Sequence, residues 1–416
     1  MIALFWDGSY FFGLFAFWQL KKLNIPFSLI TAKEVKTGEL RKYKLLLVPG
    51  GWTGPKNEAL GEEGREEIKR FVREGGNYVG ICGGAGLGLS ESDGLCLLPV
   101  KRKKFRELAN FFGKIRLKQI PHPLWRGISA KACFNVWWPG LFEIIEKDNL
   151  KILAFYNDIS SDFYVTDLNI NDIKTYNNLG KWENYYQIKI DPKCLKGEPA
   201  ILEGKYGEGN VILSYPHLDT PNNHWEALAF LNLYNLFFKK PFFVKCIPLP
   251  NYGQTPKYAL KIIKKLKIAI KDLISFGQRQ FLWYWVTPWM LRWRKGVRGF
   301  HYLTLYLLIK EIERLMKKLS CPIPSDEIIY SLEKTLKICI PFLEKAKYLL
   351  LKERYLLGKQ PLNLISVDDE EIANLRKELF GHTPAYGGEL KRILQLIDNI
   401  LVPYLKAEII SQYKTD

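Results

Sequence analysis

The sequence predicts an α/β domain over residues 1–240, with a mostly parallel sheet flanked by helices, followed by a linker over 241–254 and an all-α domain over 255–416. In the first part, short apolar runs alternate with longer stretches of helical spacing, which is typical of a parallel sheet with helices on both faces. Closely spaced prolines indicate the linker. Beyond it, one predicted helix follows another and few strand signals remain.

The individual elements follow from apolar periodicity and from glycines that end each run. Gly8 ends the first apolar run, and Gly75-Gly76 follows the amphipathic stretch 56–74 in the manner of a helix C-cap. Predicted strands are 2–6, 26–30, 43–48, 78–81, 134–137, 152–156, 186–190, 200–206 and 210–214. Predicted helices are 8–22, 56–74, 223–238, 259–274, 302–319, 325–350, 368–380 and 388–414.

The composition excludes several classes of protein. The 416 residues are 47% hydrophobic and 25% charged, as in folded globular proteins, and carry a net charge of +18. The 7 cysteines include no CxxC pair, so we predict neither a disulfide framework nor a metal site, and we expect no cofactor. Reduced thiols are typical of a cytoplasmic protein. Because the apolar N-terminus lacks a basic leader and contains Asp7, we interpret it as a strand and a helix.

The string 80–84 (GICGG) has the spacing of a nucleophile elbow with cysteine at its centre. Small residues two positions before and after the nucleophile let a sharp strand-to-helix turn pack closely. The helix N-terminus behind Cys82 favours a thiolate, and the backbone N–H of Gly83 would face an oxyanion. Gly50 and Gly51, after another predicted strand, are candidates for the second donor. The alternative interpretation is a buried cysteine beside a glycine-rich packing turn.

A cysteine nucleophile needs a base and a group that orients the base. His217 and Asp219 lie just beyond a predicted buried strand. Residues two apart in an extended segment point the same way, so both side chains could face one pocket. The alternative is a histidine at a strand end, with Asp219 forming an Asx-turn before Thr220-Pro221.

Five segments occur in a fixed order along residues 1–240: 49–51 (PGG), 75–76 (GG), 80–85 (GICGGA), 136–140 (VWWPG) and 217–219 (HLD). Together they resemble class I glutamine amidotransferase-like domains, above all the branch found at the N-terminus of biotin–protein ligases. The resemblance implies a flavodoxin-like fold. It also implies a Cys–His–acid triad, which falls on Cys82, His217 and Asp219, with Gly50, Gly51, Gly83 and Gly84 around the pocket. The family usually has Glu at the position of Asp219, and Pro at that of Leu218.

These residues predict a cysteine-dependent hydrolase or amidotransferase-like enzyme that acts on a small-molecule amide or related carbonyl. The sequence has no P-loop motif for a partner synthetase, and 294–299 (RKGVRG) only superficially resembles a biotin-ligase motif. The alternative is therefore a non-catalytic ligand-binding or scaffold module whose basic helical domain binds a membrane surface or a partner.

The stretch 276–306 interleaves aromatic residues with Arg279, Arg292, Arg294, Lys295 and Arg298. Such a mixture can bind an anionic membrane surface or an acidic partner protein, and we expect peripheral membrane association if it does. It can also stack bases and bind phosphates, although a nucleic acid is the less favoured partner. The alternative is that the aromatic side chains form the core of the helical domain and the basic side chains solvate its rim.

Overall fold

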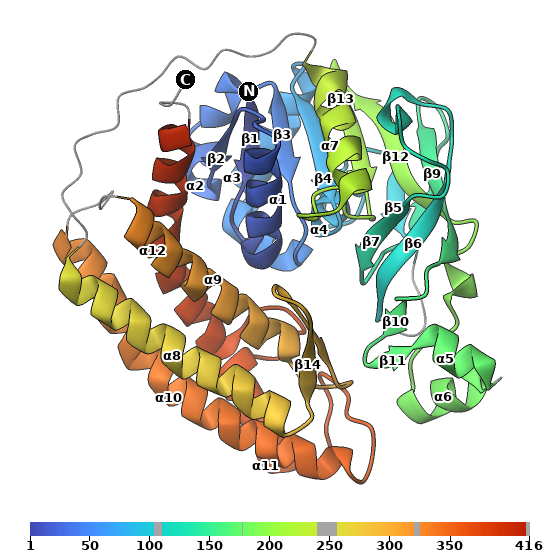
Figure 1. Cartoon of the computed structure of the whole chain (residues 1–416). Helices are drawn as coiled ribbons and strands as arrows, with labels where there is room; N and C mark the ends of the chain where they lie inside the picture. Colours follow the sequence, from blue (N-terminus) through green and yellow to red (C-terminus); the bar gives the residue numbers. More distant parts are fainter. Residues whose placement is uncertain (104–109, 177, 239–255, 320–324, 413–416) are drawn as a thin grey trace. The chain divides into compact units, whose positions relative to one another are not determined.

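The computed structural model describes residues 1–103, 110–176, 178–238, 256–319 and 325–412. The chain divides into two compact units, Met1–Val244 and Lys245–Asp416 (Figure 1). The predicted linker, 241–254, lies outside the described residues.

The strands of the N-terminal unit include both parallel and antiparallel pairs. They are β1 (Ile2–Phe5), β2 (Phe27–Ile30), β3 (Leu45–Val48), β4 (Asn77–Ile81), β5 (Val100–Arg102), β6 (Phe111–Gln119), β7 (Cys133–Trp137), β8 (Phe142–Ile144), β9 (Lys151–Ile159), β10 (Tyr164–Val165), β11 (Leu168–Asn169), β12 (Pro199–Tyr206) and β13 (Gly209–Ser214). The main sheet has the order β11-β10-β6-β9-β12-β13-β4-β3-β1-β2, with β7 paired to β6. A separate pair joins β5 to β8.

The strands β2, β1, β3, β4 and β13 are mutually parallel and form the half of the sheet that carries the elbow. Residues of β1 and β3 are buried along their whole length, as expected for parallel strands with both faces covered. From β13 outward the pairing is antiparallel. The predicted α/β fold is therefore confirmed, with a sheet that becomes mixed beyond its parallel half.

Helices of the N-terminal unit alternate with strands as predicted as far as β4, and no α-helix interrupts the described residues between β5 and β11. They are α1 (Tyr10–Lys22), α2 (Ala32–Lys36), α3 (Thr53–Arg73), α4 (Gly83–Leu87), α5 (Ile170–Thr175), α6 (Leu179–Tyr186) and α7 (His224–Phe237), with short 3₁₀ turns at Glu39–Lys42, Pro123–Trp125 and Pro192–Cys194. Helix α1 is buried on nearly every side, including Phe11, Phe15 and Phe17. This burial accounts for the apolar N-terminus, because a helix that is apolar all round belongs in a core.

The strand predicted at 186–190 is wrong. Helix α6 ends at Tyr186, and Gln187 adopts a left-handed conformation with φ of 51°. The Glu183 carboxylate then accepts the backbone N–H groups of Ile190 and Asp191, at 2.9 and 3.0 Å. A side chain thus satisfies the backbone groups that a neighbouring strand would have paired.

The C-terminal unit is helical, with one two-stranded hairpin that the sequence did not predict. Its elements are α8 (Lys257–Arg279), β14 (Trp283–Thr287), β15 (Met290–Trp293), α9 (Gly299–Lys318), α10 (Ser325–Leu357), α11 (Glu370–Phe380) and α12 (Gly388–Gln412). Trp283 anchors the hairpin, because its ring nitrogen donates to the carbonyl oxygen of Ile274 at 2.9 Å. No helix in the described part of the chain is both long enough and apolar enough to cross a membrane.

Three of the interleaved cations of 276–306, namely Arg292, Lys295 and Arg298, are nearly fully buried. Lys295 Nζ donates to the carbonyl oxygen of Leu362 at 2.9 Å, and the Arg298 guanidinium donates to that of Thr383 at 3.1 Å. Lys295 and Arg298 therefore satisfy loop carbonyl groups inside the unit. Buried in this way, the three cations are not available to an anionic surface.

Candidate functional site

Cys82 stands between β4 and α4, in the strained backbone conformation expected of an elbow. Its φ is 52° and its ψ is −108°, a conformation that side-chain-bearing residues rarely adopt. The backbone N–H of Cys82 donates to the carbonyl oxygen of Ser214 at 2.7 Å, which ties the elbow to the end of β13. The side chain is half-buried, and its Sγ lies 3.7 Å from the carbonyl oxygen of Trp137.

The glycines predicted around the pocket lie against one another. A Cβ atom on Gly83 would lie 1.7 Å from the carbonyl oxygen of Gly51, and one on Gly84 would lie 2.0 Å from that of Val48. Gly50 faces His217, since a Cβ atom there would lie 2.8 Å from Cε1 of its ring. Side chains at these positions would push the ends of β3 and β4 apart, so glycine is a requirement of close backbone approach.

The imidazole of His217 is fully buried and held on several sides. Its Nδ1 lies 2.9 Å from Oδ1 of Asp219, whose side chain is also fully buried. The ring stacks on Phe12 with centroids 4.8 Å apart and meets the edge of Trp137 at 4.6 Å. Its backbone N–H donates to the carbonyl oxygen of Asn135 at 2.8 Å. These contacts fix the ring orientation, as a general base requires.

The second ring nitrogen of His217, Nε2, makes no ordinary hydrogen bond within the described part of the chain. Burial by itself would lower the pKa of His217. The Asp219 carboxylate, through its charge and its hydrogen bond, and an interaction with Cys82 outweigh that effect and raise the pKa to about 10. The structure thus pairs His217 with Asp219 and places the imidazole within interaction range of Cys82.

Two stacked tryptophans follow directly on two residues that contact the elbow, Gly51 and Trp137. Trp52 comes after Gly51, Trp138 comes after Trp137, and their rings lie 6.1 Å apart at 27°. Both are half-buried. They form an aromatic border beside the cysteine, of the kind that binds planar or apolar groups.

Glu226, at the start of α7, is a buried carboxylate that no sequence motif singles out. Its Oε1 accepts both the backbone N–H and the side-chain amide of Asn135, the latter at 2.9 Å. Burial raises the pKa of Glu226 to about 8, against the opposing effect of those hydrogen bonds and of His217. Since the carbonyl of Asn135 accepts the N–H of His217, Glu226 is linked to His217 through one intermediate residue.

Lys56, on α3, is the second residue that sequence reasoning missed. Its side chain is fully buried, and its Nζ donates to Oγ of Ser9 at 2.7 Å. The sequence offers no signal for it, because a lysine in the amphipathic stretch 56–74 is expected on the solvent face. Among the described residues no group of three or more His, Cys, Asp or Glu side chains is placed to hold a metal ion.

Comparison with known proteins gives sequence matches to parts of this chain. The sequence model of the family described as "Biotin-protein ligase, N terminal" matches residues 28–96, which include β4, Cys82 and α4. An uncharacterized protein of Chlamydia muridarum is 27% identical over 185 residues, which are 42% of this chain and 60% of that protein. Imidazole glycerol phosphate synthase subunit HisH of Chlorobaculum tepidum is 38% identical over 78 residues, 17% of this chain and 39% of its own length.

Among solved structures, a protein of Thermoplasma acidophilum described as part of a GMP synthase is similar over 57% of this chain and 93% of its own, with 13% identity and a TM-score of 0.35. This chain spans less than two thirds of the length of the curated relatives it matches. The family match covers the predicted elbow, and the structure adds the parallel half-sheet and the strained turn that such an elbow needs. The N-terminal unit therefore has a class I glutamine amidotransferase-like fold, and its residues 28–96 match the biotin–protein ligase N-terminal family.

Proposed function

We propose that the N-terminal unit is a cysteine-dependent hydrolase or amidotransferase-like enzyme that acts on an amide or a related carbonyl. The observation that carries the proposal is the buried His217–Asp219 pair, 2.9 Å apart, beside the strained elbow of Cys82. The amidotransferase-like fold supports the same class of chemistry. Asp219 would orient the imidazole, and His217 would exchange a proton with the sulfur and the substrate.

In this scheme the Cys82 thiolate attacks the carbonyl carbon, and the C–N bond of the amide breaks as a thioester forms on the sulfur. The protonated His217 gives its Nε2 proton to the departing nitrogen. Water then attacks the thioester, with His217 as the base, and releases the acid and the free thiolate. The N–H groups of Gly51 and Gly83 would hold the oxyanion in both steps.

Alkylation of Cys82 by iodoacetamide tests whether His217 activates the cysteine, because the thiolate is the reactive form. Cys96 is exposed and serves as a reference within the same sample, with both sites followed by peptide mass spectrometry. We expect Cys82 to react faster than Cys96 at pH 7. In His217→Ala the alkylation rate of Cys82 should fall by about tenfold or more. Equal rates at the two cysteines of the wild-type protein would contradict the activated nucleophile.

The substrate can be sought by untargeted metabolite profiling of extracts incubated with the wild-type protein or with Cys82→Ala. An amide that disappears only with the wild-type protein, with the matching acid appearing, would give the substrate. His217→Ala should then lower turnover on the order of 10² or more. Profiles that do not differ between the two proteins would favour a non-catalytic module.

As a second candidate function, we propose that the C-terminal unit binds an anionic phospholipid surface. The exposed side of α8 carries Lys257, Lys261, Lys264, Lys265 and Lys271, and none of them forms an ion pair with a carboxylate of the described residues. The hairpin that follows and its entry turn expose Phe281, Tyr284 and Val286 at 74%, 49% and 47%. Unpaired lysines on an amphipathic helix, followed along the chain by exposed aromatic and apolar side chains, are typical of interfacial binding.

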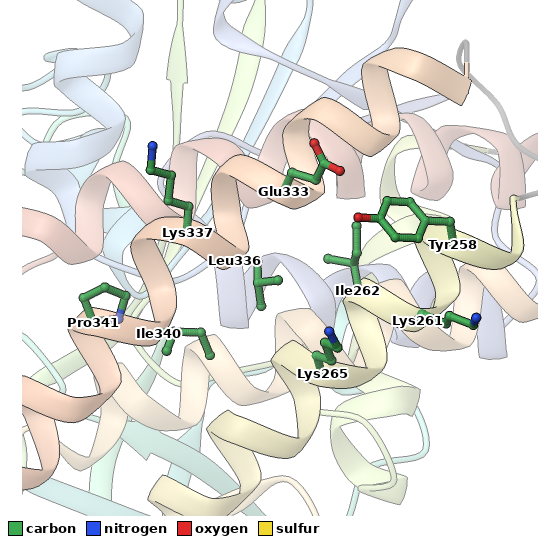
Figure 2. Close-up of a pocket in the computed structure, with 9 residues that line it drawn as sticks. All are labelled: Tyr258, Lys261, Ile262, Lys265, Glu333, Leu336, Lys337, Ile340 and Pro341. Carbon is green, nitrogen blue, oxygen red and sulfur yellow. The ribbon is translucent and has the colours of Figure 1, made fainter.

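The lysine-bearing helix α8 also borders a groove. The groove has a volume of about 620 Å³ and lies between α8 and α10. Its lining includes Lys261, Lys265 and Lys337 together with apolar side chains (Figure 2). Glu333 is the acidic residue of its lining and interacts with the hydroxyl of Tyr258. The groove therefore remains cationic and could take a phosphate-bearing headgroup.

Flotation with liposomes tests this second function. We expect binding to vesicles that contain phosphatidylserine, weaker binding in high salt, and loss of binding when Lys261, Lys264 and Lys265 are replaced by Gln. Replacing the exposed Lys174, Lys181 and Lys193 of the N-terminal unit by Gln changes the net charge equally and should leave binding intact. Equal loss of vesicle binding in both variants would contradict a lipid-binding face. So would a protein that binds DNA and does not bind vesicles.

A further inference from the structure

Lys56 is a charged side chain in a place where a charge is costly. Its side chain has no exposed surface, and Oγ of Ser9 is its hydrogen-bond partner at 2.7 Å. That hydroxyl in turn donates to the carbonyl oxygen of Phe5 at 3.2 Å, so its oxygen is free to accept from the ammonium group. Among the described residues no carboxylate forms an ion pair with Lys56. Burial of an ammonium group without a carboxylate partner destabilises a fold. Such a residue is therefore expected to have a function that requires its charge.

The ammonium group lies close to the elbow. A Cβ atom on Gly51 would lie 3.3 Å from Nζ of Lys56, and the carbonyl oxygen of Gly51 is the atom that a Cβ on Gly83 would meet at 1.7 Å. Gly83 directly follows Cys82, so Gly51 contacts the elbow on one side and lies close to the ammonium group on the other. His217 faces the neighbouring Gly50, at 2.8 Å from its Cβ position. Two basic side chains therefore converge on adjacent residues of the same turn.

The electrostatics of the buried ammonium group agree with this placement. Burial lowers the pKa of Lys56 to about 7, while the charges of Cys82 and Asp7 act in the opposite direction. The Asp7 carboxylate is itself committed to the backbone N–H of Ala32 at 2.7 Å. A negative charge on the sulfur of Cys82 would therefore be the interaction that best stabilises the charged form of Lys56.

We propose that Lys56 is a positioning residue that stabilises the thiolate of Cys82 from the Gly51 side, as a second cation beside His217. The inference rests on the proposed function, since it assigns a role to Lys56 at the same nucleophile. When the thiolate attacks a carbonyl, its charge moves to the oxyanion near the N–H of Gly51, and the ammonium group stays beside that peptide. Lys56 itself forms no bond to the substrate, and Ser9 holds it in place.

A purely structural role makes a different prediction. If Lys56 only joined α3 to the start of α1, removing it would lower stability and leave the sulfur unchanged. If Lys56 serves the thiolate, Lys56→Met removes a buried charge and retains most of the length of the side chain. The unfolding temperature should then stay the same or rise, because apolar replacement of buried charges is often stabilising.

The test measures iodoacetamide alkylation of Cys82 between pH 5 and 9, with Cys96 as the reference within each sample. We expect Lys56→Met to slow alkylation at pH 7 on the order of tenfold and to move the profile to higher pH. Lys56→Gln, which can still bond to Ser9, should show the same change and covers the case in which the Met variant fails to fold. Lys69→Met, on the same helix, removes a partly exposed lysine paired with Glu66 and should leave the alkylation profile of Cys82 unchanged.

An alkylation profile in Lys56→Met and Lys56→Gln that matches the wild-type profile would overturn the inference. His217→Ala in the same assay separates this result from failure of the triad. If the Lys56 variants slow alkylation of Cys82 and His217→Ala does not, the proposed triad is refuted and the proposed role of Lys56 is supported. If only His217→Ala slows alkylation, the triad is supported and the role of Lys56 is refuted.

Discussion

Asp219 reaches Nδ1 of His217 at 2.9 Å although its side chain is one methylene shorter than the glutamate usual at this position. The backbone N–H of His217 also bonds to Asn135, which holds the segment that carries both side chains against β7. Full burial of both side chains strengthens their attraction, since little water screens it. An aspartate at this position is therefore long enough to hold the imidazole of His217.

Glu226 gives a pH prediction at the same scale. Its pKa is raised by burial from 4.5 to about 8, so the folded protein binds a proton that the unfolded chain releases between these values. The stabilising contribution is complete below about pH 4.5 and is lost as the pH rises through 8. Glu226→Gln keeps a neutral acceptor for Asn135, and we expect its stability to fall less than that of the wild-type protein across this range, by urea unfolding.

Glu226→Ala is the matched variant. It leaves the backbone N–H of Asn135 buried without an acceptor and should lower the free energy of unfolding by about 1–3 kcal/mol at pH 6. A Gln variant as unstable as the Ala variant would show that the charged carboxylate, and not the hydrogen bond, is what the site needs.

The elbow is a property of β3, β4 and α4 acting together. Its glycines are needed because backbone meets backbone at the strand ends, which the spacing of residues 80–84 predicts. The strand predicted at 186–190 is wrong because the Glu183 carboxylate accepts a backbone N–H group that a neighbouring strand would otherwise have paired. The hairpin of β14 and β15 escapes prediction because its aromatic residues suit a helical core equally well.

A pair of glycine substitutions tests the packing of the elbow. Gly84→Ala would place a methyl group 2.0 Å from the carbonyl oxygen of Val48, and we expect a loss of about 3 kcal/mol or more in the free energy of unfolding. Gly180→Ala, in α6, is the control, because no atom beyond its own chain neighbours lies within 4 Å of the added methyl group and the helix should gain up to about 1 kcal/mol. Similar stabilities of the two variants would mean that the strand ends can part at little cost.

The whole chain has two cores, one in Met1–Val244 and one in Lys245–Asp416. In the second, Arg376 and Glu353 form a buried ion pair at 2.8 Å, and Arg376 also donates to the carbonyl oxygen of Gly296 at 2.9 Å. Burial raises the pKa of Glu353 and Arg376 opposes that shift. Removing the arginine would leave a carboxylate that must be protonated inside the core.

Differential scanning calorimetry should resolve these cores as two transitions. We expect Arg376→Met to lower one transition, with a loss of about 3–5 kcal/mol, and Gly84→Ala to lower the other. A single transition shifted equally by both variants would mean that the units unfold as one cooperative body.

The sequence by itself determined the alternation of strands and helices, the strained position of Cys82 and the pairing of His217 with Asp219. These features depend on residues close together in the chain, where spacing and side-chain size act directly. The tertiary structure alone decided that Lys56 meets Ser9, 47 residues away, and that Glu226 meets Asn135, 91 residues away. A buried charge has no local pattern, because its surroundings come from strands that only folding brings together.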